Sequence, residues 1–174
     1  MTIKEIQNIL KREGYKAFFL KTADPHMSEY FPDHYNFIEK LTGFSGSLAQ
    51  IIITQDESLL FVDGRYHLQA EKECPDLIVM KWGLKDVPNY LEYLNQNFNE
   101  EDLICTDFRL LDSQIALNIK AKLNHLPIFE NSPNNDSKIF KLSEKYTGLN
   151  LVDKLNILRE IFKDKNYLVT TLML

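Results

Sequence analysis

The sequence predicts an α/β fold in which a mixed β-sheet is flanked by helices. Runs rich in β-branched and aromatic residues alternate with segments whose apolar residues recur at helical spacing. Two neighbouring runs, "LAQIIIT" and "SLLFV", are joined only by the polar "QDE", which predicts an antiparallel hairpin. Because the other strands are separated by helices, the sheet is expected to contain parallel and antiparallel pairs.

The first helix is predicted over residues 3–13. Thr2 and Glu5 form a T-x-x-E capping box, apolar residues follow at helical spacing, and Gly14 stands where a helix ends. "KAFFL" is then expected to be a short buried strand, and "KTADPHMSEYFPD" a loop, because its two prolines interrupt regular structure. A short helix ended by Gly43 leads into the hairpin.

Further strands and helices alternate after the hairpin. Asp63 is expected to be the N-cap of a helix over "GRYHLQAEKE", which "LIVMKW" follows as a strand, "VPNYLEYLNQNF" as a helix and "LICTDF" as a strand. Asp112 is the predicted cap of a helix over "SQIALNIKAKL", on which Ile115, Ile119 and Leu123 mark one face. A final short strand is expected near "PIF". The predicted core consists of central-strand residues packed under helices that carry Ile6, Leu10 and Ile119, and the strand residues are Phe18, Leu20, Ile51, Ile53, Leu60 and Val62.

The chain is expected to contain one domain and the start of another. Residues 1–130 form the first domain, and residues 131–148, rich in proline, asparagine, serine and charge, form a linker. Residues 149–174 are interpreted as the truncated start of a second, similar domain, because a helix followed by the strand-like "YLVTTLML" cannot enclose a core. The apolar stripe of that helix is Leu151, Leu155, Leu158 and Phe162.

The composition excludes several classes of partner. Apolar residues make up 44% of the 174 residues and charged residues 26%, as in an ordinary folded protein. The formal net charge is −5 and no stretch gathers enough lysine and arginine to bind a row of phosphates, so no nucleic-acid partner is expected. Cys74 and Cys105 indicate neither a disulfide framework nor a zinc site, which fits a cytoplasmic protein. No apolar run approaches the ~20 residues that span a bilayer, so no membrane partner is expected.

Two motifs invite a chemical interpretation, "GFSGS" and "VDGRY". A phosphate-binding loop runs from strand to helix, whereas "GFSGS" runs from helix to strand, so a helix end and a tight turn explain its glycines. In "VDGRY" the single carboxylate of Asp63 is not enough to form a catalytic site. The expected role of Asp63 is that of a helix N-cap. Arg65 remains open between a structural ion pair and binding of a carboxylate.

A metal site in "DPHMSEYFPDH" is disfavoured. His26, Glu29 and His34 could be imagined as ligands, but two prolines break the segment and the spacing fits no helical ligand pair. A polar surface loop is the expected structure.

Five segments, in this order, resemble the N-terminal part of Xaa-Pro aminopeptidases, also called aminopeptidase P. They are "DPHMSEYFPDHYNFIEKLTGFSGS", "SLLFVDGRYHLQAEKE", "VPNYLEYL", "DFRLL" and "YTGLNLVDKLNILRE". The resemblance covers nearly the whole chain. The departures are "GSLAQ", where the family usually has a small run that contains glycine, and "LFVDGRY", where tryptophan commonly precedes "TDGRY".

The resemblance implies a creatinase-type N-terminal domain without catalytic residues or metal ligands. In the family, a C-terminal "pita-bread" domain holds two divalent metal ions, usually manganese, and releases the N-terminal residue that precedes a proline. This segment alone is therefore expected to need no cofactor and to be inactive. Proline-containing peptides are the implied substrates of the parent enzyme, which is expected to be cytoplasmic. A homodimer is one assembly that the resemblance allows. The competing interpretation is a peptidase-like binding module without activity.

The resemblance also names candidates for contact with the substrate or with another subunit. They are Phe44, Ser45 and Arg65, with Glu29 as the expected carboxylate partner of Arg65. A structural role is slightly favoured for Arg65, because an arginine in the first turn of a helix opposes the helix dipole and needs an anionic partner.

Overall fold

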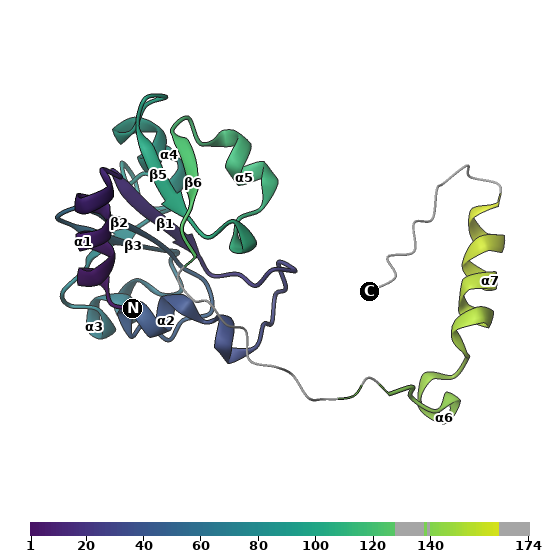
Figure 1. Cartoon of the computed structure of the whole chain (residues 1–174). Coiled ribbons are helices and arrows are strands. Elements are labelled where there is room, and N and C mark those ends of the chain that lie inside the picture. The colour runs from purple at the N-terminus through teal and green to yellow at the C-terminus, as the bar shows by residue number, and fades with distance from the viewer. Residues whose placement is uncertain (128–137, 139, 164–174) are drawn as a thin grey trace. The chain divides into compact units, whose positions relative to one another are not determined.

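The computed structural model describes residues 1–127, 138 and 140–163. The chain divides into two compact units, Met1–Pro133 and Asn134–Leu174, which are described one at a time (Figure 1). No helix among the described residues is long and apolar enough to cross a membrane.

The first unit is built on a six-stranded sheet with the order β4-β3-β2-β1-β5-β6. β2 is antiparallel to both of its neighbours, and every other pair is parallel. The predicted mixed sheet and its hairpin are therefore confirmed. The strands are β1 Ala17–Lys21, β2 Gln50–Thr54, β3 Ser58–Val62, β4 Ile78–Lys81, β5 Leu103–Thr106 and β6 Lys122–His125.

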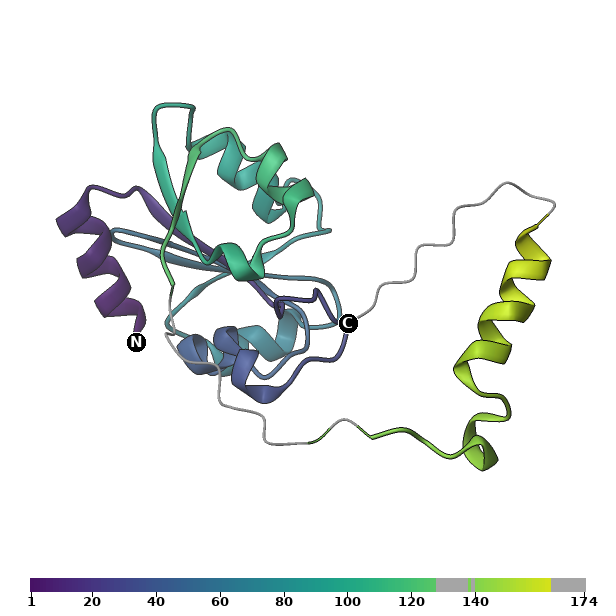
Figure 2. The same ribbon diagram turned by 45° about the vertical axis from the view of Figure 1, so that its right-hand side comes forward.

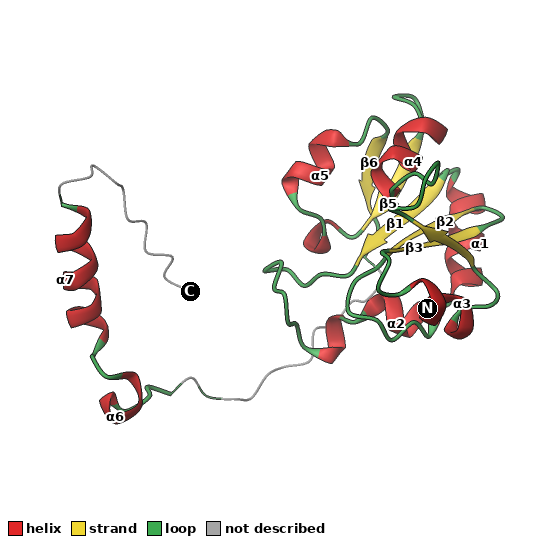
Figure 3. Ribbon diagram, turned by 180° about the vertical axis from the view of Figure 1, so that it is seen from behind, coloured by secondary structure: helices red, strands yellow, loops and turns green. Residues whose placement is uncertain are grey.

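Five α-helices of this unit lie on the two faces of the sheet (Figures 2 and 3). α1 begins after the predicted Thr2 and Glu5 capping box and ends at Gly14, whose φ of 77° is left-handed. α2 ends at Gly43, also with a φ of 77°. The helices are α1 Ile3–Glu13, α2 Phe37–Thr42, α3 His67–Glu73, α4 Tyr90–Asn97 and α5 Ser113–Asn118, with short 3-10 turns at Asp33–Tyr35 and Phe108–Leu110.

The sheet separates two apolar layers. α1, α2 and α3 contribute to the first layer, whose strand and α1 residues include the predicted core members Ile6, Leu10, Phe18, Leu20, Ile51, Ile53, Leu60 and Val62. Each of these side chains is at most 1% exposed, so this part of the core prediction is confirmed. The second layer lies under α4, where the Phe19 and Tyr90 rings stack with centroids 5.4 Å apart.

The helix predicted after Asp112 is too long, because the last residues assigned to it belong to a strand in the structure. The Asp112 side chain does cap α5, but α5 stops at Asn118, and Ile119 is buried beyond its end on the second face of the sheet. Lys122–His125 instead pairs in parallel with β5 as β6. Long-range strand pairing has overridden the local helical spacing. Of the strand expected near "PIF", Pro127 is not in a strand, and the rest lies outside the described residues.

The second unit contains two helices, α6 Glu144–Thr147 and α7 Leu151–Phe162. Asn150 is the N-cap of α7, because its Oδ1 accepts the Asp153 N–H at 2.9 Å. None of the α7 side chains is buried, and Leu151 is 67% exposed. The strand predicted over "YLVTTLML" lies outside the described residues, and the boundaries of the linker stay a prediction.

Candidate functional site

The candidate site lies at the edge of the sheet where most strands end. β1, β3 and β5 run in the same direction, and β2 runs against them and therefore begins at this edge. Four loops consequently gather there, at residues 22–36, 43–49, 63–66 and 107–112. Ligands of open α/β sheets usually bind outside the carboxyl ends of the strands. The "GFSGS" and "VDGRY" motifs both belong to this edge.

The "GFSGS" loop is folded over the ring of Phe44. The Phe44 side chain is fully buried and meets the Tyr66 ring edge-on, with centroids 5.6 Å apart. A Cβ atom on Gly46 would lie 2.2 Å from Phe44 Cζ, a distance that real Cβ atoms do not reach. Phe44 therefore supports the loop from beneath, and Gly46 is needed because the backbone passes directly over the ring.

Ser45 is bound to two residues of α3. Its N–H and its Oγ–H both donate to the Glu73 carboxylate at 2.9 Å. Gln69 Nε2 donates to Ser45 Oγ at 2.9 Å and to Glu73 Oε1 at 3.0 Å. The backbone hydrogen bond from Ser45 is the largest factor that lowers the pKa of Glu73. Sequence reasoning missed Glu73 and Gln69, although their i, i+4 spacing places both on one face of a helix.

Asp63 is not the N-cap of α3. That helix begins at His67 and has no side-chain cap, whereas Asp63 binds Arg65 within the preceding turn. Asp63 Oδ1 accepts the Arg65 N–H at 2.9 Å and Nε–H at 3.0 Å, and Oδ2 accepts Nη2–H at 2.7 Å. These bonds, with the side-chain bond largest, lower the pKa of Asp63. The Asp-x-Arg spacing lets one carboxylate accept hydrogen bonds from both the backbone N–H and the guanidinium of the same arginine.

Arg65 is held in position and yet exposed. Its guanidinium lies 5.1 Å from the ring centroid of Tyr66, whose hydroxyl is hydrogen-bonded to Ser47 Oγ at 2.7 Å. The Arg65 side chain is 63% exposed. Nε and one hydrogen of Nη2 are engaged by Asp63, so the outer edge of the fork can donate elsewhere.

The expected ion pair between Arg65 and Glu29 does not occur. Glu29 is exposed, and within the described chain no hydrogen bond or ion pair involves its carboxylate. Arg65 also precedes α3 and does not lie in its first turn, which removes the reason for favouring a structural role. Asp63 takes the place that had been predicted for Glu29.

A second Asp-x-Arg turn follows β5, in the "DFRLL" segment. Asp107 has no exposed surface and accepts Arg109 Nε–H at 2.9 Å and Nη2–H at 2.6 Å. Burial raises the pKa of Asp107, but the hydrogen bonds and charge of Arg109 outweigh burial and leave it below its ordinary value. β3 and β5 are three strand spacings apart, so the two turns are about 14 Å apart. The repeated D-x-R spacing was the signal that sequence reasoning overlooked.

The loop after β1 is organised by a buried carboxylate. Asp24 is 3% exposed, and its Oδ1 accepts the N–H groups of His26 at 3.0 Å and Ser28 at 2.8 Å. Met27 between them has a positive φ of 54°. Asp24 thus shapes the loop that carries Glu29, as asparagine and aspartate often do in turns.

The chain is similar in sequence to one family and to several curated proteins. The family model for the Creatinase/Prolidase N-terminal domain matches residues 3–132. The probable Xaa-Pro aminopeptidase P of Laccaria bicolor is 32% identical, and Xaa-Pro aminopeptidase 1 of Dictyostelium discoideum is 29% identical. Each alignment covers 94% of this chain but only 28% and 30% of the respective relative. The chain therefore spans less than a third of their length.

The fold of this chain is similar to that of several solved structures. X-prolyl aminopeptidase from Caenorhabditis elegans, described as a cytosolic enzyme with a di-nuclear active site, has a TM-score of 0.70 at 27% identity, over 87% of this chain and 27% of that one. The N-terminal domain of the cytoplasmic peptidase PepQ from Mycobacterium tuberculosis has a TM-score of 0.51 at 19% identity, over 71% of this chain and 91% of that one. The latter similarity shows the fold alone.

The described residues of this chain do not fit a di-nuclear metal centre. Such a centre needs a cluster of carboxylate and imidazole ligands. In residues 1–127, 138 and 140–163, no three or more His, Cys, Asp and Glu side chains are grouped so that they could hold a metal ion.

Proposed function

Because the chain belongs to the creatinase/prolidase N-terminal domain family, we propose that it is the non-catalytic N-terminal region of a metal-dependent Xaa-Pro aminopeptidase. Membership of this family was predicted from the sequence motifs and is confirmed. The parent enzyme removes an N-terminal residue that precedes proline. Its two divalent metal ions, manganese in this proposal, bind in a C-terminal domain outside this chain.

The names of the relatives support this activity, and the C. elegans relative supports a cytoplasmic location. In the proposal, residues 1–130 are the N-terminal domain, residues 131–148 the linker and residues 149–174 the start of a second domain. The substrates of the parent enzyme are proline-containing peptides.

The carboxyl edge of the sheet is proposed to form a wall of the catalytic cleft. The observation that carries this role is Arg65, whose guanidinium is fixed by Asp63 and Tyr66 while its outer edge is exposed. A fixed guanidinium loses little rotamer freedom when it binds a carboxylate or a peptide carbonyl. Ser45 and the buried Phe44 shape the loop beside it, and Glu29 offers an exposed carboxylate on the neighbouring loop.

A homodimer is the other setting for the same surface. In it, the edge that carries Arg65 and Glu29 would face the neighbouring subunit instead of the cleft of its own subunit.

A binding module without activity is the second candidate function. It would keep the fold and the Arg65 turn, but the longer polypeptide would lack metal-dependent hydrolysis.

The test compares the 174-residue chain with the longer polypeptide encoded by the same reading frame. With Xaa-Pro tripeptides as substrates, the longer protein should release the first residue and lose this activity on chelation. The 174-residue chain should show no turnover and retain no stoichiometric manganese after dialysis. Turnover or retained manganese in the short chain would contradict the assignment, and a folded longer protein without metal-dependent turnover would favour the binding module.

A further inference from the structure

The hydroxyl of Ser45 is held in one orientation by two residues of α3. Ser45 Oγ–H donates to Glu73 Oε1 at 2.9 Å, and the Ser45 N–H donates to Glu73 Oε2 at the same distance. Gln69 Nε2 donates to Ser45 Oγ at 2.9 Å and to Glu73 Oε1 at 3.0 Å. These hydrogen bonds join the "GFSGS" loop to α3 through a closed network.

The direction of each bond in this network follows from the charge of Glu73. An ionised carboxylate can only accept hydrogen bonds, and the backbone N–H of Ser45 is the largest factor that lowers the pKa of Glu73. The Gln69 amide must therefore turn its NH2 group toward Glu73, since its oxygen would face a second acceptor. Both hydrogens of that NH2 group are then used, one on Glu73 and one on Ser45.

One hydrogen-bonding capacity of the Ser45 hydroxyl is left, and it is that of an acceptor. A serine hydroxyl has one hydrogen and two lone pairs. The hydrogen is directed at Glu73 and one lone pair receives Gln69, and among the described residues no third group binds Ser45 Oγ. Ser45 is exposed, so the second lone pair can accept an N–H from a ligand. The hydroxyl cannot donate to a carbonyl while Glu73 holds its hydrogen.

The neighbouring turn has the opposite character, because Arg65 can donate but cannot accept. Asp63 accepts from Nε and Nη2 of Arg65, and the Arg65 side chain is still 63% exposed. The turn and the "GFSGS" loop are in contact, since Ser47 Oγ and the Tyr66 hydroxyl are hydrogen-bonded at 2.7 Å. The two adjoining segments therefore offer one fixed donor and one fixed acceptor. A peptide backbone presents the complementary pair, a C=O and an N–H.

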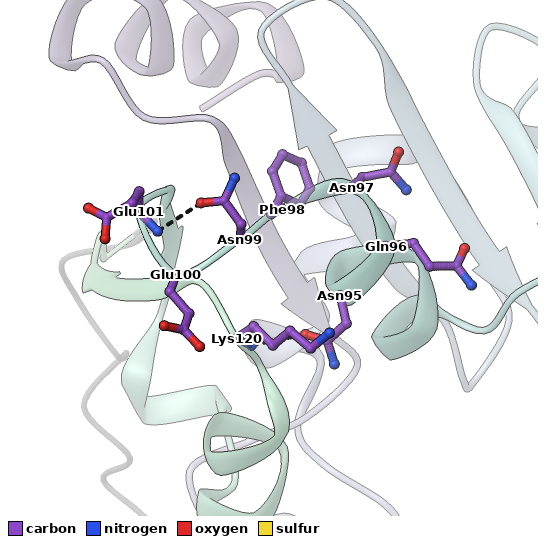
Figure 4. Close-up of a pocket in the computed structure, with 8 residues that line it drawn as sticks. All are labelled: Asn95, Gln96, Asn97, Phe98, Asn99, Glu100, Glu101 and Lys120. Atoms are coloured by element: carbon purple, nitrogen blue, oxygen red, sulfur yellow. Dashed lines mark hydrogen bonds between the residues drawn. The ribbon is translucent and has the colours of Figure 1, made fainter.

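A depression of about 500 Å³ elsewhere on the first unit provides the contrast (Figure 4). Asn95 Oδ1 accepts the Lys120 N–H at 2.9 Å, and Asn95 Nδ2 donates to the Asn118 carbonyl at 2.8 Å. Asn99 Oδ1 accepts the Glu101 N–H at 2.8 Å. These side chains bind the nearby backbone, and no hydroxyl group lines the depression. It therefore has no counterpart of the oriented serine.

We propose that Ser45 accepts a hydrogen bond from a backbone N–H of the peptide substrate, and that Glu73 is the positioning residue that keeps Ser45 an acceptor. In an Xaa-Pro-Yaa peptide the proline nitrogen carries no hydrogen, so the N–H of Yaa is the first one beyond the cleaved bond. The only other N–H donor of a tripeptide backbone is its ammonium group, which a carboxylate holds better than a hydroxyl does. The inference rests on the proposed function, because it takes the carboxyl edge as a wall of the cleft.

The test compares Ala-Pro-Ala with its ester analogue, in which oxygen replaces the N–H between proline and the last residue. Both compounds are cut at the same Ala–Pro bond. In the full-length enzyme, KM should be about fivefold higher for the ester, as expected for one lost neutral hydrogen bond. Ser45→Ala should raise KM for the peptide about fivefold and leave KM for the ester unchanged, so that their ratio falls to about one. Ser45→Thr keeps the hydroxyl and should keep the ratio.

Glu73→Gln tests the positioning role. Glutamine can donate as well as accept, so the hydrogen of the Ser45 hydroxyl is no longer fixed and the ratio should fall to about two. A purely structural role of Glu73 would lower the melting temperature and leave the ratio at its wild-type value. Glu101→Gln is the matched control, since it changes another exposed glutamate, on the depression of Figure 4, and should leave both KM values unchanged.

Three outcomes would overturn the inference. The first is a ratio of about one in the wild type. The second is a ratio that persists in Ser45→Ala, which would assign the effect to the weaker ester carbonyl. The third is an undiminished ratio in Glu73→Gln.

Failure of the proposed function gives a different result. A full-length protein that cuts neither compound contradicts that function. Calorimetric titration of the same proteins with the same two compounds then decides the inference, because the ratio of the Kd values should respond to the variants as the ratio of the KM values does.

Discussion

Replacing Gly46 by alanine should destabilise the first unit through a single steric conflict. The new Cβ atom would lie 2.2 Å from Cζ and 2.6 Å from Cε1 of Phe44. The ring cannot swing into solvent, because Phe44 is fully buried and packs edge-on against Tyr66. Overpacking of this kind costs about 1–3 kcal/mol, and we expect about 2 kcal/mol here. For a unit of this size that corresponds to a melting temperature lower by about 6–10 °C.

Gly64→Ala is the matched control. A Cβ atom at Gly64 would meet no atom within 4 Å, and this glycine has no left-handed φ. Alanine should therefore be neutral there, or stabilising by about 0.5 kcal/mol through the unfolded state. Thermal unfolding of both variants, followed by circular dichroism, measures the difference. A Gly46→Ala protein that melts within about 1 °C of the wild type would refute the packing of the loop over Phe44.

Two further predictions concern the stability of the first unit. Ile53→Asp should abolish cooperative unfolding of the first unit, because Ile53 is fully buried in a strand. An unpaired buried carboxylate costs several kcal/mol, against a total free energy of unfolding of about 5–15 kcal/mol. An unchanged melting temperature would contradict the placement of β2. The pKa of Asp107 is lowered in the folded state, so its contribution to stability is present above the ordinary value of 3.8 and is lost as the pH falls through the folded pKa. Acid titration of unfolding should therefore be less steep in Asp107→Asn than in the wild type, and equal slopes would show that Arg109 does not hold this carboxylate in the charged form.

Local signals predicted most of the fold. The capping box at Thr2, Gly14 and Gly43 set the ends of α1 and α2, and the short polar connection set the hairpin. The error after Asp112 has a different origin, since β6 exists because it pairs with β5, a partner distant in sequence. Helical spacing carries no information on such a pairing.

The sequence predicted the turns of the candidate site but not the contacts between their side chains. "GFSGS" and "VDGRY" lie in connecting turns as predicted, although the helix expected from Gly64 begins only at His67. Their partners depend on which loops meet at the carboxyl edge. Glu73 binds Ser45 from a helix 28 residues along the chain. Asp63 could have been assigned to Arg65 from their spacing alone, but the more common role of aspartate as a helix cap was preferred.

The most direct test of the proposed function is the kinetics of Arg65→Ala in the full-length enzyme. The ion pair with Asp63 is local, with the Arg65 side chain 63% exposed and the Asp63 side chain 17% exposed, so its loss should change the melting temperature by no more than about 3 °C. Arg12→Ala removes another exposed arginine that is paired with a neighbouring carboxylate, and it serves as the control. If the carboxyl edge forms a wall of the cleft, Arg65→Ala should raise KM for Xaa-Pro peptides about tenfold or more, whereas Arg12→Ala should not. An unchanged kcat/KM in a fully folded Arg65→Ala enzyme would contradict the account.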